Sequence, residues 1–108
     1  MILLAAATRA NRHEAFAAVN DAIVVLGGWV EGHTLFSNVA ATFRLVLPAR
    51  AFGQLAGRLD RLQVRLDAES RAAIAALDPS DADTFAALSV TFIHDEPDLR
   101  REVPPVDG

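Results

Sequence analysis

The hydrophobic pattern of this chain changes its period twice. Apolar residues recur at helical spacing over 16–26 and then alternate over 39–45, as in a β-strand. The same succession returns, with helical spacing over 52–59 and alternation over 64–66. With the apolar run at 2–8, the order is strand, helix, strand, strand, helix, strand, which is a split βαβ arrangement. We therefore predict an α+β, ferredoxin-like βαββαβ sandwich, with an antiparallel sheet and two helices on one face.

Local signals predict the bounds of the first two elements. Ile2–Thr8 is apolar at nearly every position, which is typical of a central strand covered on both faces. Asn11 is a suitable N-cap because Glu14 follows three residues later, as in a capping box. A pair of glycines follows Leu26, and glycine readily takes the left-handed conformation that ends helices. These signals predict a helix over 11–26.

Residues 29–36 and 39–47 alternate in hydrophobicity around Ser37-Asn38, which predicts a hairpin with a two-residue turn. The register that this turn sets pairs Val30 with Leu45, Gly32 with Phe43, Glu31 with Arg44, and His33 with Thr42. The first two pairs face the helices, and the other two lie on the opposite face. Trp29 is then expected on that opposite face, near Val46.

The second half of the chain adds further elements. We predict a helix after Pro48 over 49–60, a strand over 63–67, a short helix over 68–77 and an extra strand over 84–94. From residue 95 onward, three prolines and many charges predict a flexible acidic tail. The expected organisation is one domain, 1–94, followed by the tail 95–108.

Composition narrows the class of protein. The 108 residues suit one domain, and the absence of cysteine excludes disulfides and thiolate metal sites. The net charge is −4, which argues against general nucleic-acid binding. No segment approaches the roughly 20 apolar residues that a membrane-spanning helix needs, so we expect a cytoplasmic protein without membrane contact.

No catalytic signature appears along the chain. There is no Gly-x-Ser-x-Gly elbow, no phosphate-binding loop and no dinucleotide fingerprint. The histidines, His13, His33 and His94, have no partner at a recognised metal-binding spacing. We therefore expect no catalytic residue, metal or cofactor, and a small enzyme of unidentified chemistry remains a remote alternative.

The order of elements, with Gly27-Gly28-Trp29-Val30 after the first helix, resembles ACT-like domains of the ferredoxin-like fold. The resemblance covers roughly Met1 to Asp67. Members of that family are regulatory modules that bind amino acids or other small ligands, often at dimer interfaces beside the loop after the first strand. The resemblance therefore implies a non-enzymatic homodimer that binds a small anionic or amino-acid ligand through Arg9, Asn11 and Arg12.

A protein-interaction or assembly subunit is the alternative. Trp29, His33 and Arg44 are the interface candidates on the outer face of the sheet, where tryptophan is a favoured anchor. The helix over 49–60 carries arginines along one side, which suits docking against an acidic segment. Either a second subunit or the strand over 84–94 is expected to cover the outer face.

Overall fold

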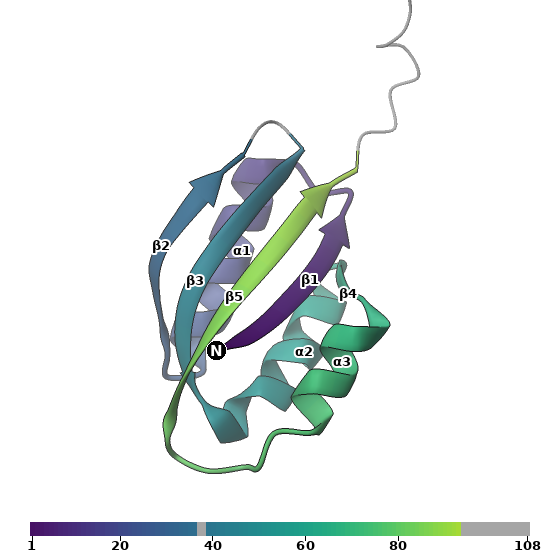
Figure 1. Cartoon of the computed structure of the whole chain (residues 1–108). Helices are drawn as coiled ribbons and strands as arrows, with labels where there is room; N and C mark the ends of the chain where they lie inside the picture. Colours follow the sequence, from purple (N-terminus) through teal and green to yellow (C-terminus); the bar gives the residue numbers. More distant parts are fainter. Residues whose placement is uncertain (37–38, 94–108) are drawn as a thin grey trace, which may run out of the picture.

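Helices and strands follow one another along the chain as the hydrophobic periods predict. The computed structural model describes residues 1–36 and 39–93. Its elements are β1 (Ile2–Thr8), α1 (Arg12–Val25), β2 (Trp29–Leu35), β3 (Ala40–Pro48), a 3₁₀ turn (Ala49–Ala51), α2 (Phe52–Arg61), β4 (Val64–Leu66), α3 (Ala68–Ala75) and β5 (Asp83–Phe92) (Figure 1). The α+β class is confirmed. Residues 37–38, which include the predicted hairpin turn, and the predicted tail lie outside the described residues.

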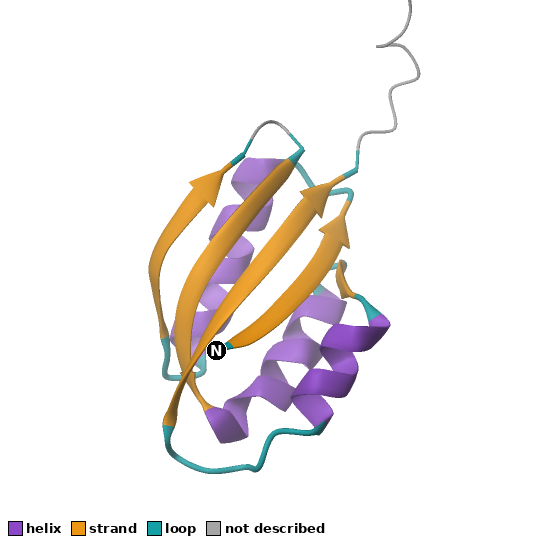
Figure 2. Cartoon of the chain, viewed as in Figure 1, coloured by secondary structure: helices purple, strands orange, loops and turns teal. Residues whose placement is uncertain are grey.

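The five strands form one mixed sheet in the order β2-β3-β5-β1-β4 (Figure 2). The last strand, β5, lies inside the sheet, antiparallel to β3 and parallel to β1. The prediction of an antiparallel sheet is therefore wrong at the β1–β5 pair. An alternating strand pattern shows which residues face inward, but it does not show which strand becomes the neighbour. Since β5 is part of the sheet, it also does not cover the outer face.

The core lies between the sheet and two helices. From α1, Val19 and Ile23 are fully buried, and from α2, Phe52, Leu55 and Leu59 are fully buried. They pack against large side chains on the inner face of the strands: Leu4, Phe43, Leu45, Val64, Leu88 and Val90. Both helices cover the same face of the sheet, as the pattern predicts (Figure 1).

The ends of α1 form as the sequence indicates. The side chain of Asn11 accepts a hydrogen bond from the backbone N–H of Glu14 at 2.9 Å, which confirms the N-cap. At the other end, Gly27 adopts φ +91°. The N–H of Gly28 donates to the carbonyl of Ile23, which closes the helix in a Schellman-type end.

The β2–β3 hairpin contains a β-bulge at Glu31. Val30 pairs with Leu45 as predicted, but the register shifts before Gly32, which lies opposite Arg44. His33 consequently lies opposite Phe43. Three predicted pairs are therefore wrong: Glu31 with Arg44, Gly32 with Phe43, and His33 with Thr42. One extra residue in a strand moves every later side chain to the other face.

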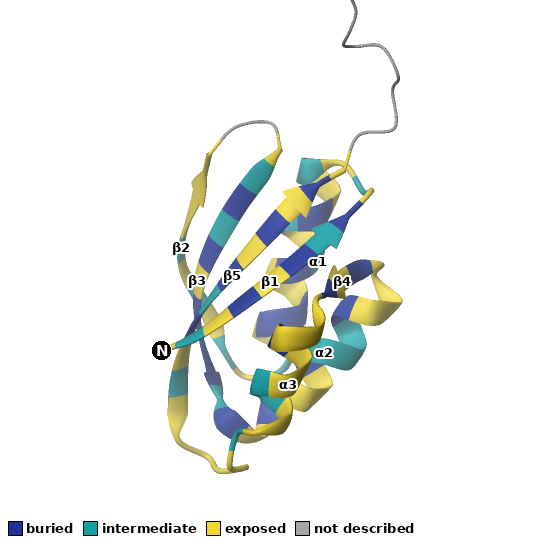
Figure 3. Ribbon diagram, turned by 45° about the vertical axis from the view of Figure 1, so that its right-hand side comes forward, coloured by how far each residue is buried: buried dark blue, intermediate teal, exposed yellow. Residues whose placement is uncertain are grey.

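Only one face of the sheet is covered by helices. The prediction that both faces of β1 are covered is wrong, because the side chain of Leu3 is 71% exposed and Ala5 is also exposed. Along β1, β3 and β5, bands of buried residues alternate with exposed or half-buried ones (Figure 3). This alternation is that of a two-layer structure with an open outer face.

The edge of the sheet beside β1 is completed by α3. Strand β4 has three residues and pairs only with residues Ala6 to Thr8 of β1. Beyond it, the hydroxyl of buried Ser70 accepts from the N–H of Ala5 at 2.8 Å, and the N–H of Asp67 donates to the carbonyl of Ala5. The start of α3 therefore takes the hydrogen-bonding place of the residues that β4 lacks.

Candidate functional site

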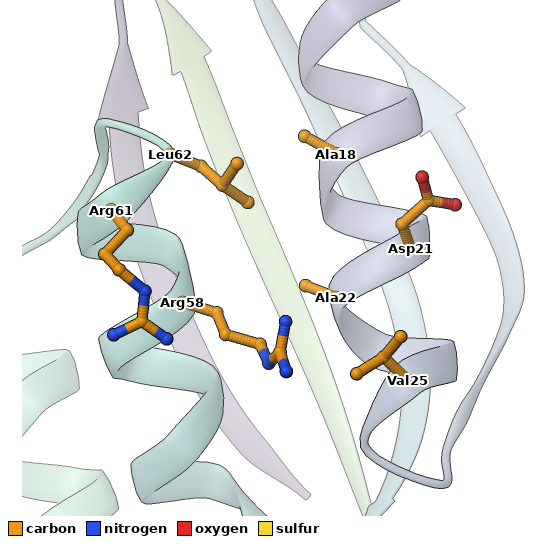
Figure 4. A pocket seen from close by; sticks show the side chains of 7 residues that line it. All are labelled: Ala18, Asp21, Ala22, Val25, Arg58, Arg61 and Leu62. Atoms are coloured by element: carbon orange, nitrogen blue, oxygen red, sulfur yellow. The ribbon is translucent and has the colours of Figure 1, made fainter.

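A groove separates α1 from α2 on the covered side of the sheet (Figure 4). Four strands at about 4.8 Å spacing are roughly 19 Å wide, which matches two helices of about 10 Å each. The insertion of β5 adds about 4.8 Å to the width without adding a helix over the centre. The groove is the consequence of this wider sheet.

The groove is a cavity of about 350 Å³ with a largely apolar lining. On α1, Ala18 and Ala22 lie one turn apart, and their small side chains leave space beside the helix. Val25 continues this wall, and Leu62 points across from the end of α2 (Figure 4). A volume of this size is within the range of small-molecule sites in proteins.

Two guanidinium groups form the polar part of the groove. Arg58 and Arg61 lie three residues apart on α2, and Arg58 reaches toward α1 (Figure 4). Within residues 1–36 and 39–93, neither has a hydrogen-bond or ion-pair partner. Asp21 lies at the rim on α1, with its carboxylate turned away from α2 (Figure 4). The groove thus combines an apolar floor with a cationic wall, which suits a carboxylate that carries an apolar body.

A second cavity, of about 400 Å³, lies where β1 and β5 end. Arg9, one of the predicted ligand contacts, lines it together with Arg65 and Gln63. Gln63 has φ +62°, in the left-handed region, where it makes the tight connection between α2 and β4. Asp60 also lines this cavity, but its carboxylate is paired with Arg71, at 2.6 Å for the shorter contact.

The other two predicted ligand residues lie elsewhere. Asn11 uses its side-chain oxygen to cap α1, and Arg12 is half-buried in the first turn of that helix. Neither lines the cavity beside Arg9. The polar residues that the structure does bring to Arg9 are Asp60 in the last turn of α2, Gln63 in the connection after it and Arg65 in β4. Their positions in the sequence gave no sign of this.

The predicted interface residues divide between the two faces of the sheet. Trp29 lies opposite Val46 as expected and is 46% exposed, and Arg44 is exposed on the outer face. His33 is on the inner face because of the bulge, with its ring 4.9 Å from that of Phe16 on α1. His33 is therefore not part of the outer surface on which it was expected.

The described residues hold no group of three histidine, aspartate or glutamate side chains placed to bind a metal ion. None of the helices in this part of the chain is long and apolar enough to cross a membrane. Comparisons with protein-family models, curated proteins and solved structures found no match for the chain. The structure thus defines an α+β protein with a five-stranded mixed sheet, and the case for function depends on its own surfaces.

Proposed function

We propose that this protein is a small-ligand-binding module whose groove between α1 and α2 takes an organic carboxylate with an apolar body. The observation that carries the proposal is the placement of Arg58 and Arg61 on one wall of an otherwise apolar cavity of about 350 Å³. A guanidinium group offers a planar pair of donors that matches a carboxylate. Within the described residues neither guanidinium is engaged by another side chain, so both can turn to a ligand in the groove.

The two parts of such a ligand have separate contacts. Its apolar body packs on Ala18, Ala22 and Leu62, while its carboxylate accepts hydrogen bonds from the two guanidiniums. An amino acid would add an ammonium group, and the carboxylate of Asp21 is turned away from the place where that group would lie (Figure 4). We therefore favour a simple carboxylate over a zwitterion.

The ferredoxin-like and ACT-like interpretation is part of the same proposal. Without β5, the sheet order is β2-β3-β1-β4, with the connections of a split βαβ. The protein is then a ferredoxin-like domain into which a C-terminal strand has inserted. The ACT-like resemblance instead favours a ligand beside Arg9, and the presence of Arg65 in that cavity supports this second site.

A titration with a homologous series of ligands tests the groove. Butyrate, hexanoate and octanoate would be added to the ¹⁵N-labelled full chain, with hexanol as the uncharged control. We expect amide shift changes on the facing sides of α1 and α2. Each added methylene buries more apolar surface, worth at most about 0.8 kcal/mol, so affinity rises with chain length. Hexanol binds more weakly because it forms no charge-assisted hydrogen bond.

Matched variants identify the site. Arg58→Gln with Arg61→Gln is expected to weaken hexanoate binding by roughly 10-fold or more, since hydrogen bonds to charged groups contribute about 1.5–3 kcal/mol. Arg50→Gln removes an exposed arginine that lines neither cavity and serves as the control. If Arg9→Gln and Arg65→Gln abolish binding and the groove variant does not, the ligand site is the cavity beside Arg9. If no carboxylate binds, the proposed function is wrong.

A further inference from the structure

The outer face of the sheet, on the side opposite α1 and α2, is open throughout the described residues (Figures 1 and 3). The registers place side chains from different strands in rows across this face. One row consists of Trp29, Val46 and Phe85, and another of Thr42, Ser89 and Ala5. These two rows consist of apolar and hydroxyl side chains, and Arg44 lies between them, opposite Ala87.

Large apolar side chains gather at one end of the outer face. Phe85 is 51% exposed and Leu3 is 71% exposed, while Val46 between Trp29 and Phe85 is only 1% exposed. The two aromatic side chains therefore shield Val46 while they remain half open to solvent themselves. Adjacent exposed apolar groups of this size mark an interaction surface more often than a solvated one.

The polar side chains at the centre of the outer face can be buried at little cost in free energy. The hydroxyls of Thr42 and Ser89 lie 3.1 Å apart and form a hydrogen bond with each other. Burying a hydroxyl is costly only where it has no partner, and here each provides one for the other. Ala5 and Ala87 flank this pair, so nothing tall prevents another sheet from approaching to the usual distance of about 10 Å.

The charged side chain of β3 is directed away from this centre. Gly32 lies opposite Arg44, and a methyl group on Gly32 would be 2.5 Å from the guanidinium nitrogen Nη2 of Arg44. The arginine therefore lies over β2, at the edge of the sheet, in the space that the glycine leaves. The middle of the outer face, over β5 and β1, stays flat and uncharged.

We propose that the outer face binds a second copy of this chain, sheet against sheet. The four long strands are about 19 Å wide, and seven residues at about 3.3 Å give roughly 23 Å of length, or about 450 Å² per copy. The projecting side chains of Trp29, Leu3 and Phe85 add to this area. Two copies therefore bury about 1,000 Å² in total, which is near the lower bound for a specific interface.

A second copy suits this face because the face is complementary to itself. A two-fold axis brings the same neutral hydroxyl and apolar surface to both sides, and the arginines remain at the edges. Twisted sheets of this kind pack either nearly aligned or nearly orthogonal, and the small side chains at the centre allow both. Over β5 and β1, at the centre of the face, an acidic or basic partner would find no complementary charge.

The test compares the mass of the full chain with that of two variants, by light scattering over a range of concentrations. We expect a dimer of twice the 11.6 kDa chain mass. Leu3→Glu with Phe85→Glu places two carboxylates on the outer face and is expected to raise the dimer dissociation constant by roughly 100-fold. Val24→Glu is the matched control, because Val24 is also exposed but lies on α1, on the other side of the molecule. It should leave the dimer unchanged.

A measurement on the unmutated protein makes the result independent of how well the variants fold. Trp29 is the one tryptophan of the chain, and its emission should move to shorter wavelength as the protein is concentrated. A monomer at every concentration would overturn the proposal, whether the tail or another protein covers the face. So would a dimer that persists in the Leu3→Glu and Phe85→Glu variant, or a doubled mass without a change in Trp29 emission.

Discussion

The two faces of the sheet are built from the same strands, yet their side chains differ in size as well as in polarity. On the covered face, Phe43, Leu88 and Val90 fill the space beneath the helices. On the open face, the neighbouring positions of the same strands hold small residues such as Ala87 and Ser89. At the centre of the sheet, large residues fill the core on the covered side and small residues lie on the open side, whereas the large apolar side chains of the open face lie at one end of it.

This difference indicates that the two faces contribute to different properties. The covered face supplies the apolar burial that stabilises the monomer, because its side chains are removed from water on folding. The open face contributes little to that burial, since its largest side chains remain in contact with solvent. Substitutions on the covered face should therefore change stability, and those on the open face should change association.

The strongest test of this division is a pair of truncations, one on each side. Phe52 is fully buried beneath the sheet, and Phe52→Ala should lower the free energy of unfolding by about 3–5 kcal/mol through lost burial and the cavity left behind. Leu3→Ala on the open face should change it by less than about 0.5 kcal/mol. Urea unfolding followed by circular dichroism measures both.

The protein concentration has to be low in this experiment, because a dimer adds its association energy to the apparent stability. The proposed division between the two faces would be wrong if both truncations lowered the free energy of unfolding by the same amount. A large loss for Leu3→Ala in the monomer would mean that the open face is covered within a single chain.

The two glycines of the β2 region provide a second, smaller contrast. A methyl group on Gly28 would overlap the carbonyl oxygen of Val46, which is backbone and cannot move aside. On Gly32 it would meet only the end of the flexible Arg44 side chain. We expect Gly28→Ala to lower the free energy of unfolding by about 2–3 kcal/mol and Gly32→Ala to lower it by less than about 1 kcal/mol.

Gly32→Ala has a further consequence for the open face. The displaced guanidinium of Arg44 has to move toward solvent or toward the centre of the sheet, so dimerisation should weaken while stability is nearly preserved. Urea unfolding and light scattering on the two variants separate these effects. Equal destabilisation by both substitutions would show that Arg44 is held rigidly over Gly32.

The sequence pattern was sufficient for features that depend on near neighbours in the chain. The helix α1, with its Asn11 cap and Gly27 end, follows from residues within a few positions of one another. The position of β5 could not be predicted, because the alternation of Leu88 and Val90 is the same at an edge as at the centre of a sheet. Its neighbours are decided by contacts between residues that are far apart in the sequence.

The bulge at Glu31 shows how a small local change alters a predicted surface. One extra residue moved His33 to the inner face and brought Arg44 opposite Gly32. A glycine inside a strand often marks a bulge or a close approach of another group. Gly32 therefore indicated a bulge, but the predicted pairing was derived from the length of the turn alone.

The groove between α1 and α2 could not be predicted from the sequence for a similar reason. Its arginines were visible as one side of a helix, but the opposite wall at Ala18 and Ala22 belongs to another helix, and the width of the gap depends on β5. Sequence spacing within one helix carries no information about the distance to the next.

The smallest expected effect is the pH dependence of stability, and it arises at the edge of the sheet where α3 contacts β1. Hydrogen bonds from Ser70 hold the pKa of Asp67 below its ordinary value, and those from Arg71 do the same for Asp60. A carboxyl group whose pKa is lowered by folding stabilises the folded state above its ordinary pKa of about 3.9. That contribution is lost as the pH falls through the lowered value, so we expect urea midpoints to decline below about pH 4.

Asp67→Asn separates this charge effect from helix capping, since asparagine caps a helix about as well as aspartate does. The variant should unfold slightly below the wild-type midpoint at neutral pH, because the contribution of the carboxylate charge is lost, and should show a shallower decline in acid. Amide exchange at Ala5, whose N–H is bonded to Ser70, should accelerate in acid in the wild type before exchange at the core residue Leu88 does. An unchanged acid dependence in Asp67→Asn would mean that the contact between α3 and β1 does not depend on this carboxylate. The loss of stability in acid would then require another titrating group.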